Sequence, residues 1–189
     1  CGSFFKYNEN NRNVFARLNS DGSYDNSLPV VSIPFGSNRK IHLQPSDGKI
    51  LITGNNAITR LNTDGTLNAS FSVSGGQISD LAIQSDGKII LVGSFLTYAS
   101  TTKNGIVRTI DNSFASGTRF IDGAFVGFVT SVQIQLDGKI IIGGATTRYN
   151  GFSYISASTI RLNSDGSFDN SFFVGRNVAF SGGYDCLTV

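Results

Sequence analysis

The chain of 189 residues has 40% apolar and only 15% charged residues, a composition that predicts a folded protein with its own hydrophobic core. Its formal net charge of +2 comes from 15 basic and 13 acidic residues spread along the sequence without a Lys/Arg cluster, so we expect no nucleic-acid partner. No apolar stretch approaches the roughly 20 residues that a membrane-spanning helix requires, so we expect no membrane span.

The first complete element in chain order is a hairpin that begins at Arg17 and has Asp21-Gly22 at its tip. An Asp-Gly tip supplies the positive φ angles of a tight turn between two strands. The pattern returns twice, and its three copies are Arg17–Ser23, Arg60–Thr66 and Arg161–Ser167. The recurrence predicts an antiparallel strand pair in each of these units.

A second hairpin alternates with the first and is marked by the tripeptide Asp-Gly-Lys. Before the turn, alternating apolar and polar residues such as Ile78–Gln84 predict a half-buried strand. After the turn, a nearly continuous apolar run that ends at a glycine predicts a strand covered on both faces. The copies are Asp47–Lys49 with Gly54, Asp86–Lys88 with Gly93, and Asp137–Lys139 with Gly144.

Two alternating hairpins give about four short antiparallel strands per unit, and the units recur with a period of roughly 40 to 50 residues. The sequence therefore predicts an all-β fold: a β-propeller of four-stranded antiparallel blades, with about four repeat units in this chain. A parallel β-helix has a shorter period and no antiparallel hairpin turns, and a sandwich has no long-range period.

Some segments depart from the repeat. The hairpin at Arg108 lacks the Ser-Asp-Gly tip, whereas segments 96–105 and 145–158 are longer than the repeat requires and are rich in Thr, Ser, Tyr, Gly and Asn. We expect these two segments to be loops that project from one face, because binding residues are commonly carried by loops on a rigid scaffold. The predicted ligand-binding side chains are Tyr98, Arg148, Tyr149, Asn150 and Phe152.

The ends of the chain also match the repeat. Tyr184–Val189 align with a strand that enters an Asp-Gly-Lys turn, and Cys1–Phe4 align with a strand that leaves one. Either the two ends share a blade and close a small ring, or the chain is a piece of a larger propeller. The absence of Met favours the second, so residues 1–189 are expected to be a single domain of a longer protein. Cys1 and Cys186 are expected to be buried free thiols.

Both signatures resemble those of the delta-sixty repeat family of bacterial and phage β-propeller-type repeats. The resemblance implies a propeller fold and a secreted, cell-surface or phage-virion setting, and it implies no reaction and no catalytic residue. The first family pattern, R-L-N-x-D-G-S-x-D-x-S-F, matches Arg17–Leu28, Arg60–Phe71 and Arg161–Phe172. The second, Q-x-D-G-K-I with a following apolar run, matches Gln84–Phe95, Gln135–Ala145 and, with Pro45 inserted, Gln44–Asn55.

Two recurring polar groups have both a functional and a structural interpretation. Asn163–Asp169 has oxygen-bearing side chains at alternate positions, as in a calcium loop, but lacks the later bidentate Glu of an EF-hand. A hairpin turn explains the same residues, so we predict no cofactor, with calcium as the alternative. The recurring Arg either lines an anion site or pairs within its own unit, and we favour pairing with Asp25, Asp111 or Asp169.

The same residues favour binding over catalysis. His42 is the only histidine, and no Ser or Cys nucleophile stands in a recognisable context, so we predict no enzyme. The expected function is a structural or recognition module of an extracellular, cell-surface or phage virion (tail or fibre) protein, which binds a glycan or protein partner through face loops. The alternatives are a hydrolase or lyase that acts on polysaccharide through paired carboxylates, and a self-assembling structural subunit that forms a homo-oligomer or larger assembly.

Overall fold

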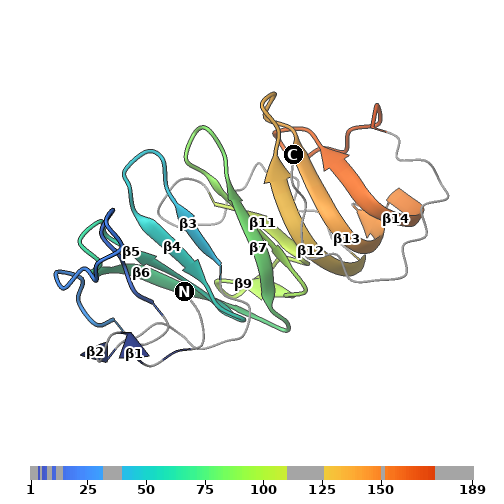
Figure 1. Cartoon of the computed structure of the whole chain (residues 1–189). Helices are drawn as coiled ribbons and strands as arrows, with labels where there is room; N and C mark the ends of the chain where they lie inside the picture. The colour runs from blue at the N-terminus through green and yellow to red at the C-terminus, as the bar shows by residue number, and fades with distance from the viewer. Residues whose placement is uncertain are drawn as a thin grey trace. The chain divides into compact units, whose positions relative to one another are not determined.

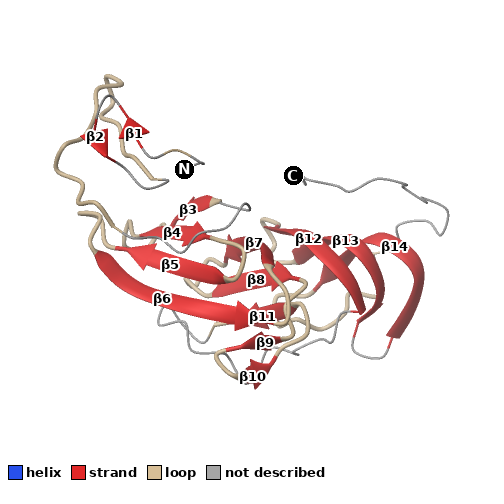
Figure 2. Ribbon diagram, turned by 90° about the horizontal axis from the view of Figure 1, so that it is seen from below, coloured by secondary structure: helices blue, strands red, loops and turns tan. Residues whose placement is uncertain are grey.

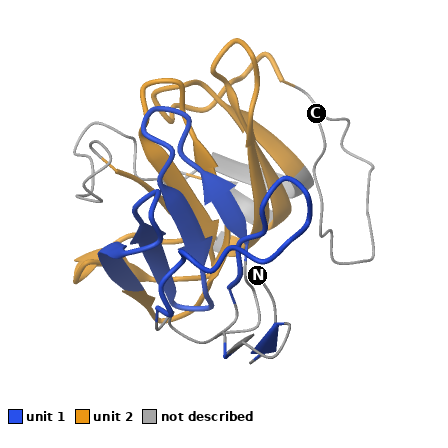
Figure 3. Cartoon of the chain, turned by 60° about the vertical axis from the view of Figure 1, so that its left-hand side comes forward, with its two compact units in different colours: residues 1–72 blue, residues 73–189 orange. Residues whose placement is uncertain are grey.

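The structure is a computed structural model and describes residues 4, 6–7, 10–11, 15–31, 40–109, 126–149 and 152–172 (Figure 1). Every regular element in these ranges is a β-strand, and all strand pairs are antiparallel. The chain divides into two compact units, residues 1–72 and residues 73–189 (Figure 3). The predicted all-β, antiparallel fold is therefore confirmed.

The first unit contains one complete set of four strands in consecutive order. Strand β3 pairs with β4, β4 with β5, and β5 with β6, and the turn of the first Asp-Gly-Lys copy joins Leu43 to Ile50. A small hairpin, β1–β2, precedes this sheet. The strands are β1 (Lys6–Tyr7), β2 (Asn10–Asn11), β3 (Ile41–Leu43), β4 (Ile50–Thr53), β5 (Ala57–Leu61) and β6 (Leu67–Ser74), of which β6 continues into the second unit.

The second unit contains two three-stranded sheets, β7–β8–β11 and β12–β13–β14 (Figure 2). A short hairpin, β9–β10, pairs with the last two residues of β6, with Val73 opposite Tyr98. The strands are β7 (Ile78–Ile83), β8 (Ile89–Gly93), β9 (Thr97–Tyr98), β10 (Thr101–Thr102), β11 (Ile106–Arg108), β12 (Val126–Ile134), β13 (Ile140–Tyr149) and β14 (Phe152–Leu162).

Four consecutive antiparallel strands, as predicted for one blade, occur once, from Ile41 to Ser74, in a sheet that β9 and β10 extend to six strands. In the second unit, the return strand of the last hairpin begins at the isolated bridge between Leu162 and Phe168, and the residues after 172 lie outside the described ranges. The predicted terminal strands fall almost wholly outside these ranges, as do Cys1 and Cys186. The number of blades, their closure into a ring and the single-domain organisation stay predictions.

Apolar runs after the Asp-Gly-Lys turns form the centre of each unit, as predicted. All five residues of β8 and all four of β4 are buried, so these strands are covered on both faces. The core of the second unit joins its two sheets through buried residues that include Ile90, Val92, Val132 and Ile142. The core of the first unit is formed by Phe15, Leu28, Ile50, Ile52 and Leu61.

The glycine that ends each apolar run has a steric explanation in the second unit. A Cβ atom on Gly93 would lie 2.0 Å from the carbonyl oxygen of Gln77, and one on Gly144 would lie 2.2 Å from that of Phe128. These distances leave no space for a side chain, because the paired strand approaches too closely. The spacing from Asp-Gly-Lys to glycine therefore reflects close backbone approach at the far end of the hairpin.

Candidate functional site

Two of the predicted ligand-binding residues are buried. Tyr98 lies at the end of β9 and Tyr149 at the end of β13, and both side chains are 0% exposed. Burial raises the pKa of Tyr98 above its ordinary value, while the Tyr149 hydroxyl donates a hydrogen bond of 2.6 Å to the carbonyl oxygen of Gly166. The prediction that both are exposed loop residues is therefore wrong.

The physical reason is that the two long segments form strands. Segment 96–105 contains β9 and β10, and most of segment 145–158 lies in β13 and β14. Thr and Tyr favour strands, so their abundance here reflects β-structure as much as loop polarity. Of the other candidates, Arg148 pairs through its backbone with Ser153, and Phe152 with Tyr149. The side chains of Arg148 and Phe152, and all of Asn150, lie outside the described part, so their role in binding stays a prediction.

The recurring arginine pairs within its own hairpin, as predicted. Arg17 Nε donates to Asp25 Oδ2 at 2.6 Å, and Arg161 Nε donates to Asp169 Oδ2 at 2.7 Å. In the second copy, Arg60 Nε donates to the Asn68 amide oxygen at 2.8 Å. The predicted partner of Arg108, Asp111, is outside the described residues. The arginines therefore tie the two strands of each hairpin together.

The same arginines also reach the next hairpin of the repeat. Arg17 Nη1 donates to the carbonyl oxygen of Thr63, and Arg108 Nη1 donates at 2.8 Å to that of Ser164. Thr63 and Ser164 hold the same position, directly before the Asp-Gly tip. In each unit, one arginine side chain thus links two consecutive repeats. The sequence pattern alone did not indicate this structural role.

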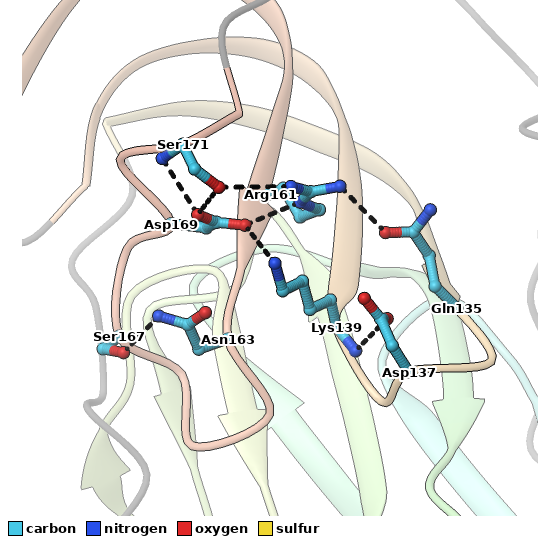
Figure 4. Close-up of polar contacts among 8 residues, drawn as sticks. All are labelled: Gln135, Asp137, Lys139, Arg161, Asn163, Ser167, Asp169 and Ser171. Carbon is cyan, nitrogen blue, oxygen red and sulfur yellow. Dashed lines mark hydrogen bonds and ion pairs between the residues drawn. The ribbon is translucent and has the colours of Figure 1, made fainter.

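The lysines of the Asp-Gly-Lys turns form ion pairs. Lys49 Nζ lies 2.6 Å from Asp47 Oδ2, and Lys88 pairs in the same way with Asp86. Lys139 differs, because its Nζ lies 3.0 Å from Asp169 Oδ2 (Figure 4).

Hydrogen bonds keep the hairpin carboxylates ionised. Bonds from the Ser27 side chain and then from Arg17 lower the pKa of Asp25 to about 2. Bonds from Ser171 and then Lys139 hold the pKa of Asp169 well below its usual range. The segment Asn163–Asp169, for which a calcium loop is the alternative interpretation, is likewise bonded to itself. Asp165 Oδ1 accepts from the Ser167 hydroxyl at 2.7 Å and from its amide at 2.9 Å. These contacts build a turn, as favoured from the sequence.

A pocket of about 450 Å³ lies at the turn end of the two sheets of the second unit. Its walls come from the β7–β8 turn, the β12–β13 turn and the tip of the hairpin that follows β14, with Arg108 at the end of β11. Carboxylates, amides and apolar side chains all line it. The lining residues are Gln84, Ser85, Asp86, Arg108, Ile134, Gln135, Leu136, Asp137, Gly138, Ser164 and Asp165.

One wall of the pocket is fixed by internal hydrogen bonds. The carbonyl oxygen of Ser164 accepts from Arg108 Nη1 at 2.8 Å and from Gln84 Nε2 at 3.2 Å, while Gln84 Oε1 accepts from Arg108 at 3.4 Å. None of these pocket residues was predicted as a binding residue. The signal that could have indicated them is the departure of this region from the repeat, at the shortened Arg108 hairpin and at Leu136.

In a comparison with known protein families, one family profile matches more than half of the chain. A family profile described as "Domain of unknown function (DUF5122) beta-propeller" matches residues 1–28, 46–71, 84–114 and 135–172. These segments contain both recurring hairpin signatures. A comparison with curated proteins gives no match.

Among solved structures, the chain is similar to a crystal structure of a protein of unknown function from Bacteroides caccae. The two share 15% sequence identity with a TM-score of 0.46, over 69% of this chain and 48% of that chain. The chain therefore spans about half the length of that protein.

Proposed function

Since the chain belongs to the β-propeller family described as a domain of unknown function (DUF5122), we propose that it is a non-catalytic structural or recognition module that binds a glycan or protein partner at the turn end of its sheets. We further propose that its repeats are of the delta-sixty type. In this proposal the chain is part of an extracellular, cell-surface or phage virion protein, such as a tail or fibre component.

One observation carries the proposal: the pocket at the turn end of the second unit, where the repeating framework leaves polar groups unused. Elsewhere the recurring charged side chains are engaged with one another, as in the Arg17–Asp25 and Arg161–Asp169 pairs. A rigid framework of this kind permits variation at its turns without cost to the core. The pocket is therefore the part of the described chain best suited to contact a partner.

The pKa shifts of two acidic residues of the pocket, Asp86 and Asp165, favour binding over glycoside hydrolysis. A general acid in that reaction needs a raised pKa. Burial raises the pKa of Asp86, but hydrogen bonds from Lys88 outweigh it, so the net pKa lies below the ordinary value. Hydrogen bonds from the side chain and amide of Ser167 lower the pKa of Asp165. Both carboxyl groups are thus shifted in the direction opposite to that of a proton donor.

A test of this function uses the full chain and a panel of polysaccharides. We expect the chain to be retained on at least one polysaccharide, or on a protein partner, without release of new reducing ends from the polysaccharide. Reducing ends that appear with the wild-type chain and disappear with Asp137→Asn or Asp165→Asn would show that the chain is a hydrolase. New unsaturated products would show a lyase. Either result would overturn the proposal.

A specific observation favours self-assembly as a second candidate function. Strand β3 stands at the end of its sheet, with Ile41 38% exposed and Leu43 65% exposed. An apolar edge strand offers unpaired backbone groups to another chain. Light scattering over a range of concentrations tests this function: a larger mass that Leu43→Lys reduces to a monomer supports it, and a monomer at every concentration removes it.

A further inference from the structure

We propose that the pocket of the second unit binds a neutral saccharide, and that Gln135, Leu136 and Asp137 contact it directly. The inference rests on the proposed recognition function and names the ligand class of its site. The pocket volume of about 450 Å³ lies within the range of roughly 300 to 1,000 Å³ that is typical of small-ligand sites.

Three departures from the repeat occur together at this pocket. First, the hairpin whose first residue, Arg108, lines the pocket lacks in its sequence the Asp-Gly tip that the other three hairpins have. Second, Leu136 occupies the position of Ser46 and Ser85 in the other Asp-Gly-Lys turns, and its side chain is fully exposed. Third, Lys139 pairs with Asp169 and not with Asp137 of its own turn. A framework role requires none of these changes, since the other copies fold without them.

The third departure leaves a carboxylate available. Asp137 Oδ1 accepts only the backbone amide of Lys139, at 3.0 Å, and among the described residues its Oδ2 has no partner (Figure 4). Next to it, Gln135 Oε1 accepts from Arg161 at 3.4 Å, while Gln135 Nε2 has no partner within the described ranges. Among the described residues, Asp165 accepts hydrogen bonds through its Oδ1, from Ser167. The pocket thus offers one amide donor and two carboxylate acceptors to a ligand.

The charges around the pocket favour a neutral ligand. The pocket has three carboxylates, of which Asp86 is paired with Lys88. An anionic ligand would meet the other two, Asp137 and Asp165, whereas a cationic ligand would meet the guanidinium of Arg108. A hydroxyl group both donates and accepts, so a ligand with several hydroxyls can bond the Gln135 amide and the Asp137 carboxylate at once. A saccharide also has an apolar C–H face, which the exposed Leu136 side chain and Ile134 can cover.

The two walls of the pocket have different roles. Arg108, Gln84 and Ser164 are bonded to one another, so this wall keeps its shape without a ligand. The turn Gln135–Gly138 presents a donor, an apolar side chain and an acceptor in three consecutive residues. This preorganised arrangement reduces the entropy that binding costs.

Calorimetry with the full chain and neutral trisaccharides of glucose, galactose, mannose and N-acetylglucosamine tests the proposal. We expect at least one to bind. We expect Asp137→Asn to weaken that binding about 10-fold, as the loss of one charged hydrogen bond predicts. Leu136→Ser, which restores the residue of the other copies, is expected to weaken it by a similar factor. Both residues are exposed turn residues, so the melting temperature should stay unchanged and exclude misfolding.

The matched controls are Asp47→Asn and Ser46→Leu in the first Asp-Gly-Lys turn, and neither is expected to change the affinity. The proposal is overturned if no neutral trisaccharide binds, if the two pocket variants bind as the wild type does, or if charged oligosaccharides or peptides bind in place of neutral ones. Binding of a glycan or protein elsewhere would overturn this inference while leaving the recognition function in place. Product release from polysaccharide would overturn the recognition function itself.

Discussion

The turns at Asp47–Lys49 and Asp137–Lys139 share the Asp-Gly-Lys tripeptide and a glycine with positive φ, although Pro45 makes the first turn one residue longer. The charged side chains of the two turns have different partners. In the first unit, Lys49 pairs with Asp47 of its own turn at 2.6 Å. In the second unit, Lys139 pairs with Asp169 at 3.0 Å, and within the described ranges Asp137 keeps a single hydrogen bond, from the backbone amide of Lys139. The repeat therefore places the same tripeptide and a glycine with positive φ in both turns, whereas neighbouring residues determine which of the charges are neutralised.

This difference explains where function can arise in a repeat protein. In a turn whose charges are paired internally, as in the Asp47–Lys49 turn, the lysine already neutralises the carboxylate. A turn whose lysine pairs elsewhere has a carboxylate that is free to bind a ligand, as Asp137 is among the described residues. The change needs no new fold, only a nearby competing acceptor such as Asp169.

Substitution of Gly144 in the second unit should give the largest effect on stability. We expect Gly144→Ala to reduce the free energy of unfolding by about 3 kcal/mol, because its Cβ would lie 2.2 Å from the carbonyl oxygen of Phe128. Gly138→Ala is the matched control. Its Cβ would meet nothing closer than 3.7 Å, so only its φ of 81° opposes the change, at about 1 kcal/mol. Equal losses in urea denaturation would contradict the steric explanation.

Removing the charge of Asp169 or of Asp137 should show which of the two carboxylates stabilises the fold. Asp169→Asn is expected to lower the melting temperature clearly, because the buried carboxylate accepts from both Arg161 and Lys139. Asp137→Asn is expected to leave it unchanged, since this exposed carboxylate has no ion pair in the described part of the chain. Thermal unfolding followed by circular dichroism measures both. A larger loss for Asp137→Asn would reverse the assignment of the two residues.

Loss of the Tyr149 hydroxyl tests how much its hydrogen bond to Gly166 stabilises the hairpin that follows β14. Tyr149→Phe is expected to reduce the free energy of unfolding by about 1 to 2 kcal/mol, because the carbonyl oxygen of Gly166 loses a buried hydrogen bond of 2.6 Å. An unchanged stability would mean that water replaces the hydroxyl. Because Tyr149 is fully buried, the same variant should leave saccharide binding unaltered.

The smallest expected effect is a pH dependence of stability in the first unit. The folded pKa of Asp25 is about 2, below its ordinary value of 3.8, so its contribution is complete above pH 4 and is lost as the pH falls from about 4 to about 2. Asp25→Asn should make the unfolding free energy fall less steeply across this range. Urea titrations between pH 2 and pH 6 compare the two slopes, and parallel curves would contradict the role of Asp25.

Much of the framework is predictable from the sequence because it depends on local chemistry. The Asp-Gly tips require positive φ, as at Gly166, and the apolar run Ile89–Gly93 requires cover on both faces, so turn and buried strand follow directly. The pairing of Arg161 with Asp169 is also predictable, since the hairpin brings the two residues together.

The candidate site could not be predicted, because it depends on contacts between distant segments. The sequence around Tyr98 predicts a loop, whereas in the structure Tyr98 lies in β9, which pairs with the end of β6. In the sequence, Lys139 has the same position as Lys49 and Lys88, and only the folded structure shows that it pairs with Asp169. A fully exposed Leu136 is a visible departure from Ser46 and Ser85, but its meaning depends on the pocket that it lines.

The most direct test of the central claim, that departures from the repeat and not the repeat itself form the binding site, is an amide chemical-shift map of the isotope-labelled full chain with the trisaccharide that binds most tightly. We predict that the largest shifts occur at the backbone amides of Gln135–Gly138 and at the Gln135 side-chain amide, while the amides of Asp47–Lys49 do not move. Shifts centred on the Asp47–Lys49 turn, or spread equally over all the Asp-Gly-Lys turns, would contradict it.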